Sequence, residues 1–268
     1  MKTLLAVNTL TSVNVQAYAS HLNLFYRMGK DSSDTCMLYN GYRQSIDFFR
    51  NNAAKVALQH ECDYLMFLDD DVLVPPNTYS VLKERDVDVV TPVVYIRGYP
   101  FEPMFFQAHS EDGYSRLGFY RDWKDHILEN GLIPCAAVGF SCALIKCSLL
   151  LKVPPPWFVT GVAHTEDVYF CVKCRQMLNN QVNICVDSSL HAGHLLDPEF
   201  IHTETRDSLR TFYETTVPEF LTERSDVRVQ SVVENNIKEL EAVPSISDEF
   251  LLELRNGKSK IVSVSNET

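Results

Sequence analysis

Asp63-Tyr64-Leu65-Met66-Phe67-Leu68-Asp69-Asp70-Asp71 is the stretch of sequence that decides the fold. Tyr64 to Leu68 form a continuous apolar run, which is typical of a strand buried on both faces. The run ends directly in three adjacent carboxylates. Open sheets of parallel strands bind their ligands just beyond the carboxyl ends of the strands. The triple aspartate therefore falls where such a fold places its ligand site.

Helix and strand signals alternate on both sides of this run. Apolar residues at spacings of three and four predict a helix over 45–60, and Pro75-Pro76 opens a helix that extends to Arg85. The other expected helices are 13–27 and 166–179, and the expected strands are 3–7, 35–39, 63–68, 87–94 and 182–186. Residues 135–153 carry strand, turn and helix signals in succession. This alternation predicts an α/β fold with a largely parallel sheet.

Two regions depart from the alternation. Residues 96–134 have weak periodicity, many aromatic residues and scattered Gly and Pro, so we expect a long loop that serves as a lid or an acceptor-binding insert. From about Asp197 the pattern changes to short charged helices at 206–215, 231–241 and 247–255. The expected organisation is a core over 1–200, followed by a C-terminal helical extension and polar tail over 201–268.

Composition excludes several classes of protein. The chain has 268 residues and a charge of 24 − 35 = −11, which argues against wholesale nucleic-acid binding by a basic stripe. No stretch reaches the roughly 18 apolar residues of a spanning helix, and Met1–Val7 is too short for a secretory core. We therefore expect a soluble, cytoplasmic protein whose eight cysteines are reduced thiols. A less favoured alternative is a zinc site of Cys171, Cys174, His191 and His194.

The triple aspartate is a candidate metal site. Three adjacent ionised carboxylates repel one another unless a cation compensates them. On an extended segment Asp69 and Asp71 point the same way, so they can share one ligand. Such oxygen ligands suit Mg²⁺ or Mn²⁺, which also bind phosphate oxygens. The alternative is a solvated turn that caps a helix.

Three further motifs follow in the sequence. Thr165-Glu166-Asp167 opens a helix, either as ordinary capping or as a carboxylate base aimed at a hydroxyl nucleophile. His191-Ala192-Gly193-His194 comes after the last core strand and offers an imidazole for a divalent metal. Gly139 allows the backbone to approach a ligand closely. Each of these motifs is weak by itself.

The order of the motifs is more specific. A DxD after an apolar strand, a Gly-containing loop, an xED at a helix start and a late His resemble the GT-A fold glycosyltransferases, which use nucleotide sugars, and especially their family-2 pattern. The resemblance covers residues 3–195 and implies the Rossmann-like GT-A fold, with a mixed, largely parallel sheet flanked by helices. Arg50-Asn51 lies in the helix before the DxD strand, as in many inverting members.

The resemblance also implies roles for individual residues. Asp71 would bind Mn²⁺ or Mg²⁺ directly, together with Asp69 and His194, with His191 left open as the alternative histidine. Asp167 would be the catalytic base, and Glu166 would position the acceptor or support the loop. The residues implied to bind the nucleotide sugar are Asn8, Thr9, Arg50, Asn51, Asp69, Asp70 and Gly139.

The expected activity is transfer of a sugar from a nucleoside-diphosphate sugar, UDP-sugar above all, to an acceptor hydroxyl. We expect an inverting reaction, with a retaining one left open. The acceptor is either a glycan or a hydroxymethylated base in DNA, as for some phage enzymes, in a bacterial or phage-infected cytosol. The rival interpretations are a nucleotidyltransferase and a non-catalytic nucleotide-sugar-binding module. The oligomeric state is left open.

The site motifs account for much of the acidity of the core. Residues 195–268 hold 15 acids and 8 bases, so residues 1–194 carry 16 − 20 = −4. Five of these 20 acids belong to the aspartate triplet and to Glu166-Asp167, and without them the segment would be +1. The net charge therefore does not argue against a phosphate-bearing substrate.

Overall fold

The computed structural model describes residues 1–31, 34–120, 123–128, 131–162, 164–196 and 199–216. Its centre is a seven-stranded sheet in the order β2-β1-β3-β10-β5-β11-β8. The strands are β1 (Lys2–Thr9), β2 (Thr35–Tyr42), β3 (Tyr64–Leu68), β5 (Val89–Val93), β8 (Leu132–Pro134), β10 (Cys142–Lys146) and β11 (Ile184–His191). β10 and β8 run antiparallel to their neighbours, and the other five strands share one direction. The mixed, largely parallel sheet is confirmed.

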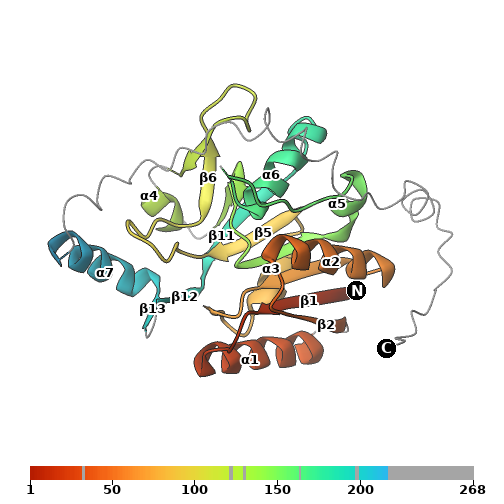
Figure 1. Ribbon diagram of the computed structural model, residues 1–268, viewed down its shortest axis with the longest axis horizontal. Helices are drawn as coiled ribbons and strands as arrows, with labels where there is room; N and C mark the ends of the chain where they lie inside the picture. Colours follow the sequence, from red (N-terminus) through yellow and green to blue (C-terminus); the bar gives the residue numbers. More distant parts are fainter. Residues whose placement is uncertain (32–33, 121–122, 129–130, 163, 197–198, 217–268) are drawn as a thin grey trace.

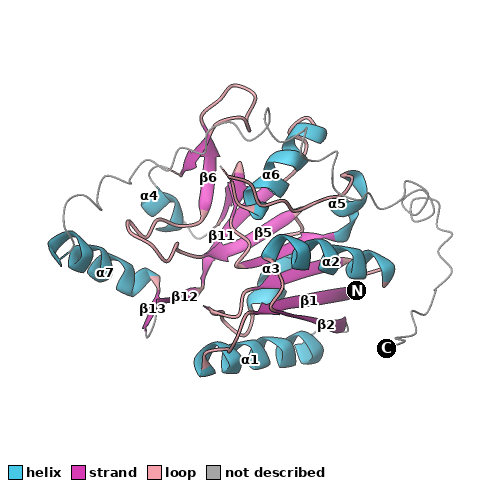
Figure 2. Cartoon of the chain, in the orientation of Figure 1, coloured by secondary structure: helices cyan, strands magenta, loops and turns pink. Residues whose placement is uncertain are grey.

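Helices cover both faces of the sheet (Figures 1 and 2). One face packs against α1 (Val15–Asp31) and α3 (Thr78–Glu84), and the other against α2 (Ile46–Gln59), α5 (Cys147–Lys152) and α6 (Glu166–Met177). The run in β3 shows why its sequence is continuously apolar. Leu65 and Phe67 belong to the α2 side of the core, whereas Met66 and Leu68 belong to the α1 side. A strand buried on both faces has no position left for a polar side chain.

The expectation of a long loop over 96–134 is wrong. Within it lie β6 (Phe105–Ala108), β7 (Leu117–Phe119), α4 (Trp123–Leu128) and β8. β6 pairs with β7 and with β9 (Ala137–Val138) in a small antiparallel sheet. Strands of two to four residues are too short to show a clear alternation of apolar and polar positions, so the sequence pattern missed them.

β11 is longer than the expected strand over 182–186. It continues through Asp187-Ser188-Ser189, whose polar side chains concealed it, and its register shifts between Asp187 and His191. Asp187 is buried and accepts a bond of 2.6 Å from Nε of Arg85. The charged partner explains how a carboxylate is tolerated inside the sheet.

A second small sheet follows β11. It contains β13 (Glu199–Ile201), β12 (Gly193–Leu196) and β4 (Val72–Leu73), and α7 (Thr203–Thr216) comes next. The expected division at 200/201 stays a prediction. Arg206 of α7 is buried and donates to the carbonyl oxygen of Phe101 at 2.9 Å, so α7 packs on the 96–134 segment. The expected helices at 231–241 and 247–255 lie outside the described residues.

No helix in the described ranges has both the length and the apolar character needed to cross a membrane.

A buried carboxylate ties three elements together on the α1 side of the sheet. Asp34, just before β2, accepts a hydrogen bond from Tyr79 of α3 at 2.9 Å and pairs with Lys83 and with the amino group of Met1. Burial raises the pKa of Asp34, but these donors outweigh that effect and bring the pKa down to about 2. Because the pKa is depressed on folding, the stabilisation is present above the unfolded value and is lost as the pH falls through the folded one.

We therefore predict that Asp34→Asn lowers the free energy of unfolding by roughly 2 kcal/mol at pH 7. The difference from the wild type should shrink between pH 4 and pH 2, as the wild-type carboxyl takes up its proton. Urea unfolding at a series of pH values measures it, with the exposed Glu111→Gln as the control. A difference that is constant down to pH 2 would contradict the assignment.

Candidate active site

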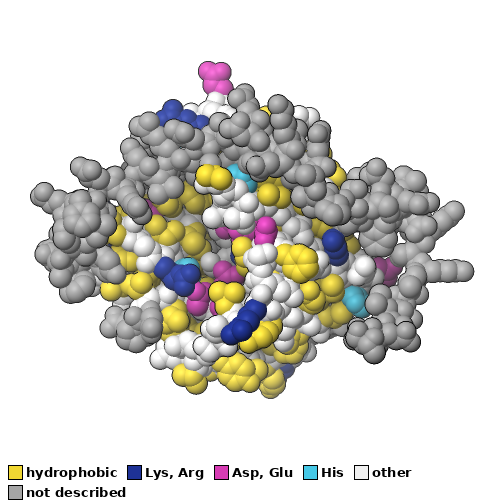
Figure 3. Space-filling view, in the orientation of Figure 1, with side chains coloured by type: hydrophobic (Ala, Val, Ile, Leu, Met, Phe, Trp, Pro, Cys, Tyr) yellow, Lys and Arg dark blue, Asp and Glu magenta, His cyan; other side chains and the backbone are white. Residues whose placement is uncertain are grey.

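The candidate site lies at the edge of the sheet where the parallel strands end. Asp69 directly follows β3, and its backbone N–H donates to the carbonyl oxygen of Ser141 at 2.8 Å. Tyr95 and Arg97 follow β5, and His194 follows β11. Figure 3 shows acidic side chains grouped near the middle of one face of the molecule, with basic side chains close by. The edge rule for parallel strands thus brings distant motifs together.

Asp71 and His194 form the candidate metal centre. Antiparallel pairing of β4 with β12 places His194 opposite Val72, and the N–H of Leu195 donates to the carbonyl oxygen of Asp71 at 2.9 Å. His194 Nε2 then lies 3.6 Å from Asp71 Oδ1. The other ring nitrogen, Nδ1, lies 2.7 Å from the carbonyl oxygen of Tyr95. A carbonyl oxygen accepts only from an N–H, so Nδ1 donates to Tyr95, and Nε2 is the ring nitrogen turned toward Asp71.

His191 does not reach this centre. Its Nδ1 lies 2.7 Å from the hydroxyl of Thr203 at the start of α7. Of the two histidines in the motif, His194 is the one that faces an aspartate of the triplet.

Arg97 lies in the 96–134 segment, and the sequence patterns did not connect it with the aspartate triplet. Its guanidinium lies 2.8 Å from Asp71 Oδ2, while more than half of the side chain is exposed. Burial raises the pKa of Asp71, but the hydrogen bond with His194 and the charges of His194 and Arg97 lower it below the ordinary value. The signal was available, because Arg97 follows the end of β5 closely and therefore lies at the site edge.

Arg50 links the two acidic motifs. It projects from α2, is 2% exposed, and donates to Glu166 Oε1 at 2.5 Å and to the carbonyl oxygen of Phe140 at 3.1 Å. Its Nη2 also lies 3.4 Å from Asp69 Oδ1. The guanidinium stacks against the rings of Phe67 and Phe140 at 5.3 and 5.6 Å. The structure therefore uses Arg50 inside the protein, between the aspartate triplet and the start of α6.

The site has more negative charge than its cations balance. Burial raises the pKa of Asp69, assisted by the charge of Asp71 and opposed by Arg50. Burial also raises the pKa of Asp70. Glu166 is 5% exposed, and burial raises its pKa to about 7 although Arg50 opposes the shift. In all three carboxyl groups the largest cause is burial, which disfavours the charged form.

Asp167 holds the loop that follows β9. Its Oδ2 accepts the N–H of Phe140 at 3.2 Å, and its Oδ1 accepts the N–H of Val168 at 2.7 Å and the hydroxyl of Thr165. Asp167 is only partly buried, in contrast to Glu166. It is therefore the carboxylate of this motif that reaches the solvent side of the site.

Other residues that the resemblance implied to bind the nucleotide sugar make internal contacts. The side chain of Asn51 accepts from the N–H of Trp157 at 2.9 Å and donates to the carbonyl oxygen of Phe158 at 2.6 Å. Asn8 is buried and donates to the carbonyl oxygen of Gln44 at 3.1 Å, and Thr9 accepts the N–H of Arg43 through its backbone at 2.9 Å.

Gly139 fits tightly against a neighbour inside the protein. A Cβ at this position would lie 2.9 Å from Cβ of Met104, and the N–H of Gly139 donates to the Met104 carbonyl oxygen at 2.7 Å. The close approach that requires a glycine here is thus made by Met104.

Asp70 points toward the end of β1. Its Oδ2 lies 3.3 Å from the N–H of Leu10, so it connects the aspartate triplet with the loop after Thr9.

The aromatic residues of the 96–134 segment mostly pack on one another. Trp123 lies edge-on to Tyr95 and also contacts the guanidinium of Arg206 at 4.8 Å. It donates a hydrogen bond to Glu102 at 2.8 Å. Phe106 stacks on Phe119. These rings stabilise the segment on α7.

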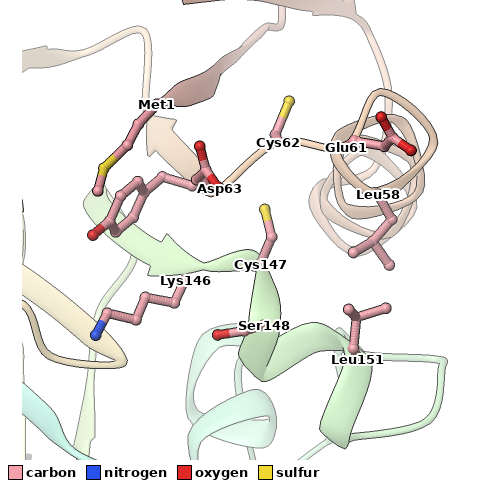
Figure 4. Close-up of a pocket in the computed structure, with 10 residues that line it drawn as sticks. Met1, Leu58, Glu61, Cys62, Asp63, Lys146, Cys147, Ser148 and Leu151 are labelled. Carbon is pink, nitrogen blue, oxygen red and sulfur yellow. The ribbon is translucent and has the colours of Figure 1, made fainter. Parts of the chain in front are cut away.

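A pocket of about 460 Å³ lies at the opposite end of β3, among Met1, Leu58, Cys62, Cys147 and Leu151 (Figure 4). It is formed where β3 begins and β10 ends, at the amino ends of the parallel strands. It is therefore separate from the aspartate triplet.

The donors at the candidate centre suit a divalent ion that takes its remaining ligands from substrate and water. Within the described ranges no group of three or more His, Cys, Asp or Glu residues is arranged to hold a metal by itself. Asp71 and His194 supply one oxygen and one oriented nitrogen. Mg²⁺ and Mn²⁺ commonly bind through one or two protein ligands plus phosphate oxygens, so the pair fits such an ion.

We predict that breaking the Arg50 contact destabilises the fold in a pH-dependent way. Arg50→Met leaves the Glu166 carboxylate buried without a partner, which costs about 3–5 kcal/mol when the group is ionised. A raised carboxyl pKa means that stability is lost as the pH rises through it. Urea unfolding should therefore show a larger loss at pH 8 than at pH 5.5, and Arg50→Met/Glu166→Gln should recover part of it. Arg43→Met, at an exposed arginine, is the control.

We also predict that Mn²⁺ raises the melting temperature of the protein, by roughly 2–4 °C for each kcal/mol of binding. His194→Ala and Asp71→Ala should abolish the shift, because each removes a ligand. His191→Ala should keep it, since His191 contacts Thr203 and not Asp71. Equal shifts in both histidine variants would place the ion elsewhere.

Comparisons with known proteins identify no family for this chain: no family model and no curated protein matches it. Among solved structures it resembles A197 from STIV, with 21% identity, a TM-score of 0.48, and coverage of 75% of this chain and 94% of that one. It also resembles GalNAc-T7 with UDP, GalNAc and Mn²⁺, with 13% identity, a TM-score of 0.42, and coverage of 72% and 42%. It also resembles 4-diphosphocytidyl-2C-methyl-D-erythritolsynthase from Anaerococcus prevotii, with 7% identity, a TM-score of 0.36, and coverage of 79% of this chain and 96% of that one.

Proposed function

We propose that the protein is a metal-dependent glycosyltransferase that moves a sugar from a nucleoside-diphosphate sugar, above all a UDP-sugar, to an acceptor hydroxyl. The observation that carries the proposal is the pairing of Asp71 with an oriented His194. A second carboxylate motif, Glu166-Asp167, lies at the same edge of the sheet and is joined to Asp69 through Arg50. In transfer from a diphosphate donor, a metal ion can stabilise the leaving group and a separate carboxylate can take the proton of the acceptor.

Asp71 and His194 would hold Mn²⁺ or Mg²⁺, which neutralises the charge that develops on a diphosphate leaving group. Arg97, paired with Asp71, is placed to contact the same phosphates when it leaves the carboxylate. Asp69 is kept in position by Arg50 and by its backbone bond to Ser141.

Asp167 is the proposed base of an inverting reaction. The N–H of Phe140 holds one of its oxygens, and the side chain is less buried than that of Glu166. It would take the proton from the acceptor hydroxyl as that oxygen attacks the anomeric carbon and the diphosphate leaves. Glu166 acts through Arg50 as a positioning residue.

The acceptor is proposed to be a glycan or a hydroxymethylated base in DNA. Phosphate contacts to DNA weaken steeply as salt is raised, whereas glycan binding does not depend on released counterions. A gel shift with duplex DNA at increasing salt therefore separates the two acceptor classes.

The test is hydrolysis of a panel of UDP-sugars by the full chain with Mn²⁺ and with EDTA. We expect activity only with the metal and a loss of at least about 100-fold in Asp71→Ala, since removal of one charge-stabilising group typically costs that much. Asp167→Asn should lose turnover but keep the thermal shift with Mn²⁺ and UDP. The product anomer, measured by NMR, should be inverted.

Metal-independent activity, or full activity in Asp71→Ala, would refute the proposed centre. Release of pyrophosphate from a nucleoside triphosphate and a sugar phosphate would identify a nucleotidyltransferase. Binding of UDP-sugar without turnover, unchanged by Asp167→Asn, would identify a binding module.

A further inference from the structure

The outer side of α1 carries an exposed apolar stripe. Val15, Tyr18, Leu22 and Tyr26 recur at spacings of three and four, which places them on one side of the helix. Between 51% and 76% of each side chain is exposed. Single exposed apolar residues are ordinary, but a continuous row of them along a helix usually marks an interaction surface.

The core does not need this stripe. Ala17, Leu24 and Met28 are buried and form the side of α1 that packs on the sheet. α1 is therefore apolar on two sides, whereas a helix that only covers a sheet has one apolar side and one polar side.

The apolar surface continues onto the edge of the sheet. β2 is the terminal strand, and alternate residues of a strand share a face. Cys36 packs against the core cluster that includes Leu24 and Met28 of α1. Leu38 and Tyr42 lie two and six residues after Cys36 in β2, so they face the same side of the sheet. They are 49% and 62% exposed. We call these six residues the α1–β2 surface: Val15, Tyr18, Leu22, Tyr26, Leu38 and Tyr42. Figure 3 shows hydrophobic side chains gathered along the lower margin, where Figure 1 places α1.

Bases lie at the margin of this surface. Lys30 Nζ lies 5.4 Å from the ring centre of Tyr26, and the guanidinium of Arg43 lies 5.4 Å from that of Tyr42. In α1 no acid precedes Asp31, and the carboxylate of Asp34 is buried and paired with Lys83. Lys30 and Arg43 therefore place two positive charges at the margin of this surface.

We propose that the α1–β2 surface docks on an anionic lipid membrane. Tyrosines with apolar rings and polar hydroxyls suit the boundary between headgroups and acyl chains, while valine and leucine insert and bases contact the anionic headgroups.

The surface also borders the candidate active site, although the inference does not rest on the proposed function. Arg43 Nε donates to the carbonyl oxygen of Leu10 at 3.3 Å, and the N–H of Leu10 lies 3.3 Å from Asp70. Docking through Tyr42 and Val15 therefore brings the edge with the aspartate triplet close to the headgroups.

The test is co-sedimentation of the full chain with phosphatidylcholine vesicles and with equimolar phosphatidylcholine–phosphatidylglycerol vesicles. We expect binding to the mixed vesicles only, and weaker binding as salt is raised. Tyr18→Ser/Leu22→Ser/Tyr26→Ser should lower the affinity at least about tenfold. Lys30→Gln/Arg43→Gln should remove the preference for anionic lipid.

The control is Leu151→Ser/Met177→Ser, which changes exposed apolar side chains elsewhere and should bind like the wild type. The altered side chains are exposed, so the folded state is checked by an unchanged melting temperature. Absence of binding to the mixed vesicles, equal binding to both kinds, or an unaffected triple variant would overturn the inference. So would a dimer in sedimentation velocity that the triple variant converts to a monomer, because a second copy would then occupy the surface.

Discussion

The buried guanidinium of Arg50 is the interaction on which the rest of the site depends. The end of β3 and the start of α6 both present carboxylates to the same small volume. Without a cation between them, Asp69 and Glu166 would repel each other across a region of low dielectric. Arg50 bridges the two and also binds the Phe140 carbonyl oxygen, so α2, the sheet edge and the loop after β9 have one common point.

The same arrangement explains why the residues around Arg50 are closely packed although the carboxylates of the site outnumber its cationic side chains. The rings of Phe67 and Phe140 exclude water from the guanidinium of Arg50. The lower local dielectric strengthens its ion pairs and raises the free-energy cost of any nearby carboxylate that has no cationic partner. Asp71 is paired with Arg97, whose side chain is mostly exposed. An arginine that is mostly in solvent can leave at little cost, whereas Arg50 cannot.

Much of the fold could be predicted from the sequence because its central elements have strong patterns. The apolar run of β3 reflects burial on two faces, and the periodic spacing in α2 reflects burial on one face. The sequence did not predict the short strands of the 96–134 segment or the polar half of β11. Their stability comes from strand pairing and from the Arg85–Asp187 contact, respectively. Neither leaves a local pattern.

For the site, the rule on strand ends correctly brought Asp69, Asp71 and His194 to one edge. It could not reveal how individual side chains are used. The hydrogen bonds of Asn51 to Trp157 and Phe158, and the contact of Gly139 with Met104, depend on segments far apart in the sequence. The order of the motifs therefore predicts which region of the fold a residue occupies better than it predicts which atoms the side chain contacts.

The pairing of β4 with β12 has a consequence for how the protein is made. Val72 and His194 are neighbours in that ladder although the ribosome adds them far apart in time. A nascent chain that has already completed β1, β3 and β5 still lacks the imidazole of His194, so the carbonyl oxygen of Tyr95 has no imidazole N–H from which to accept. Asp71 consequently gains its histidine neighbour only after the strands of the main sheet have been synthesised.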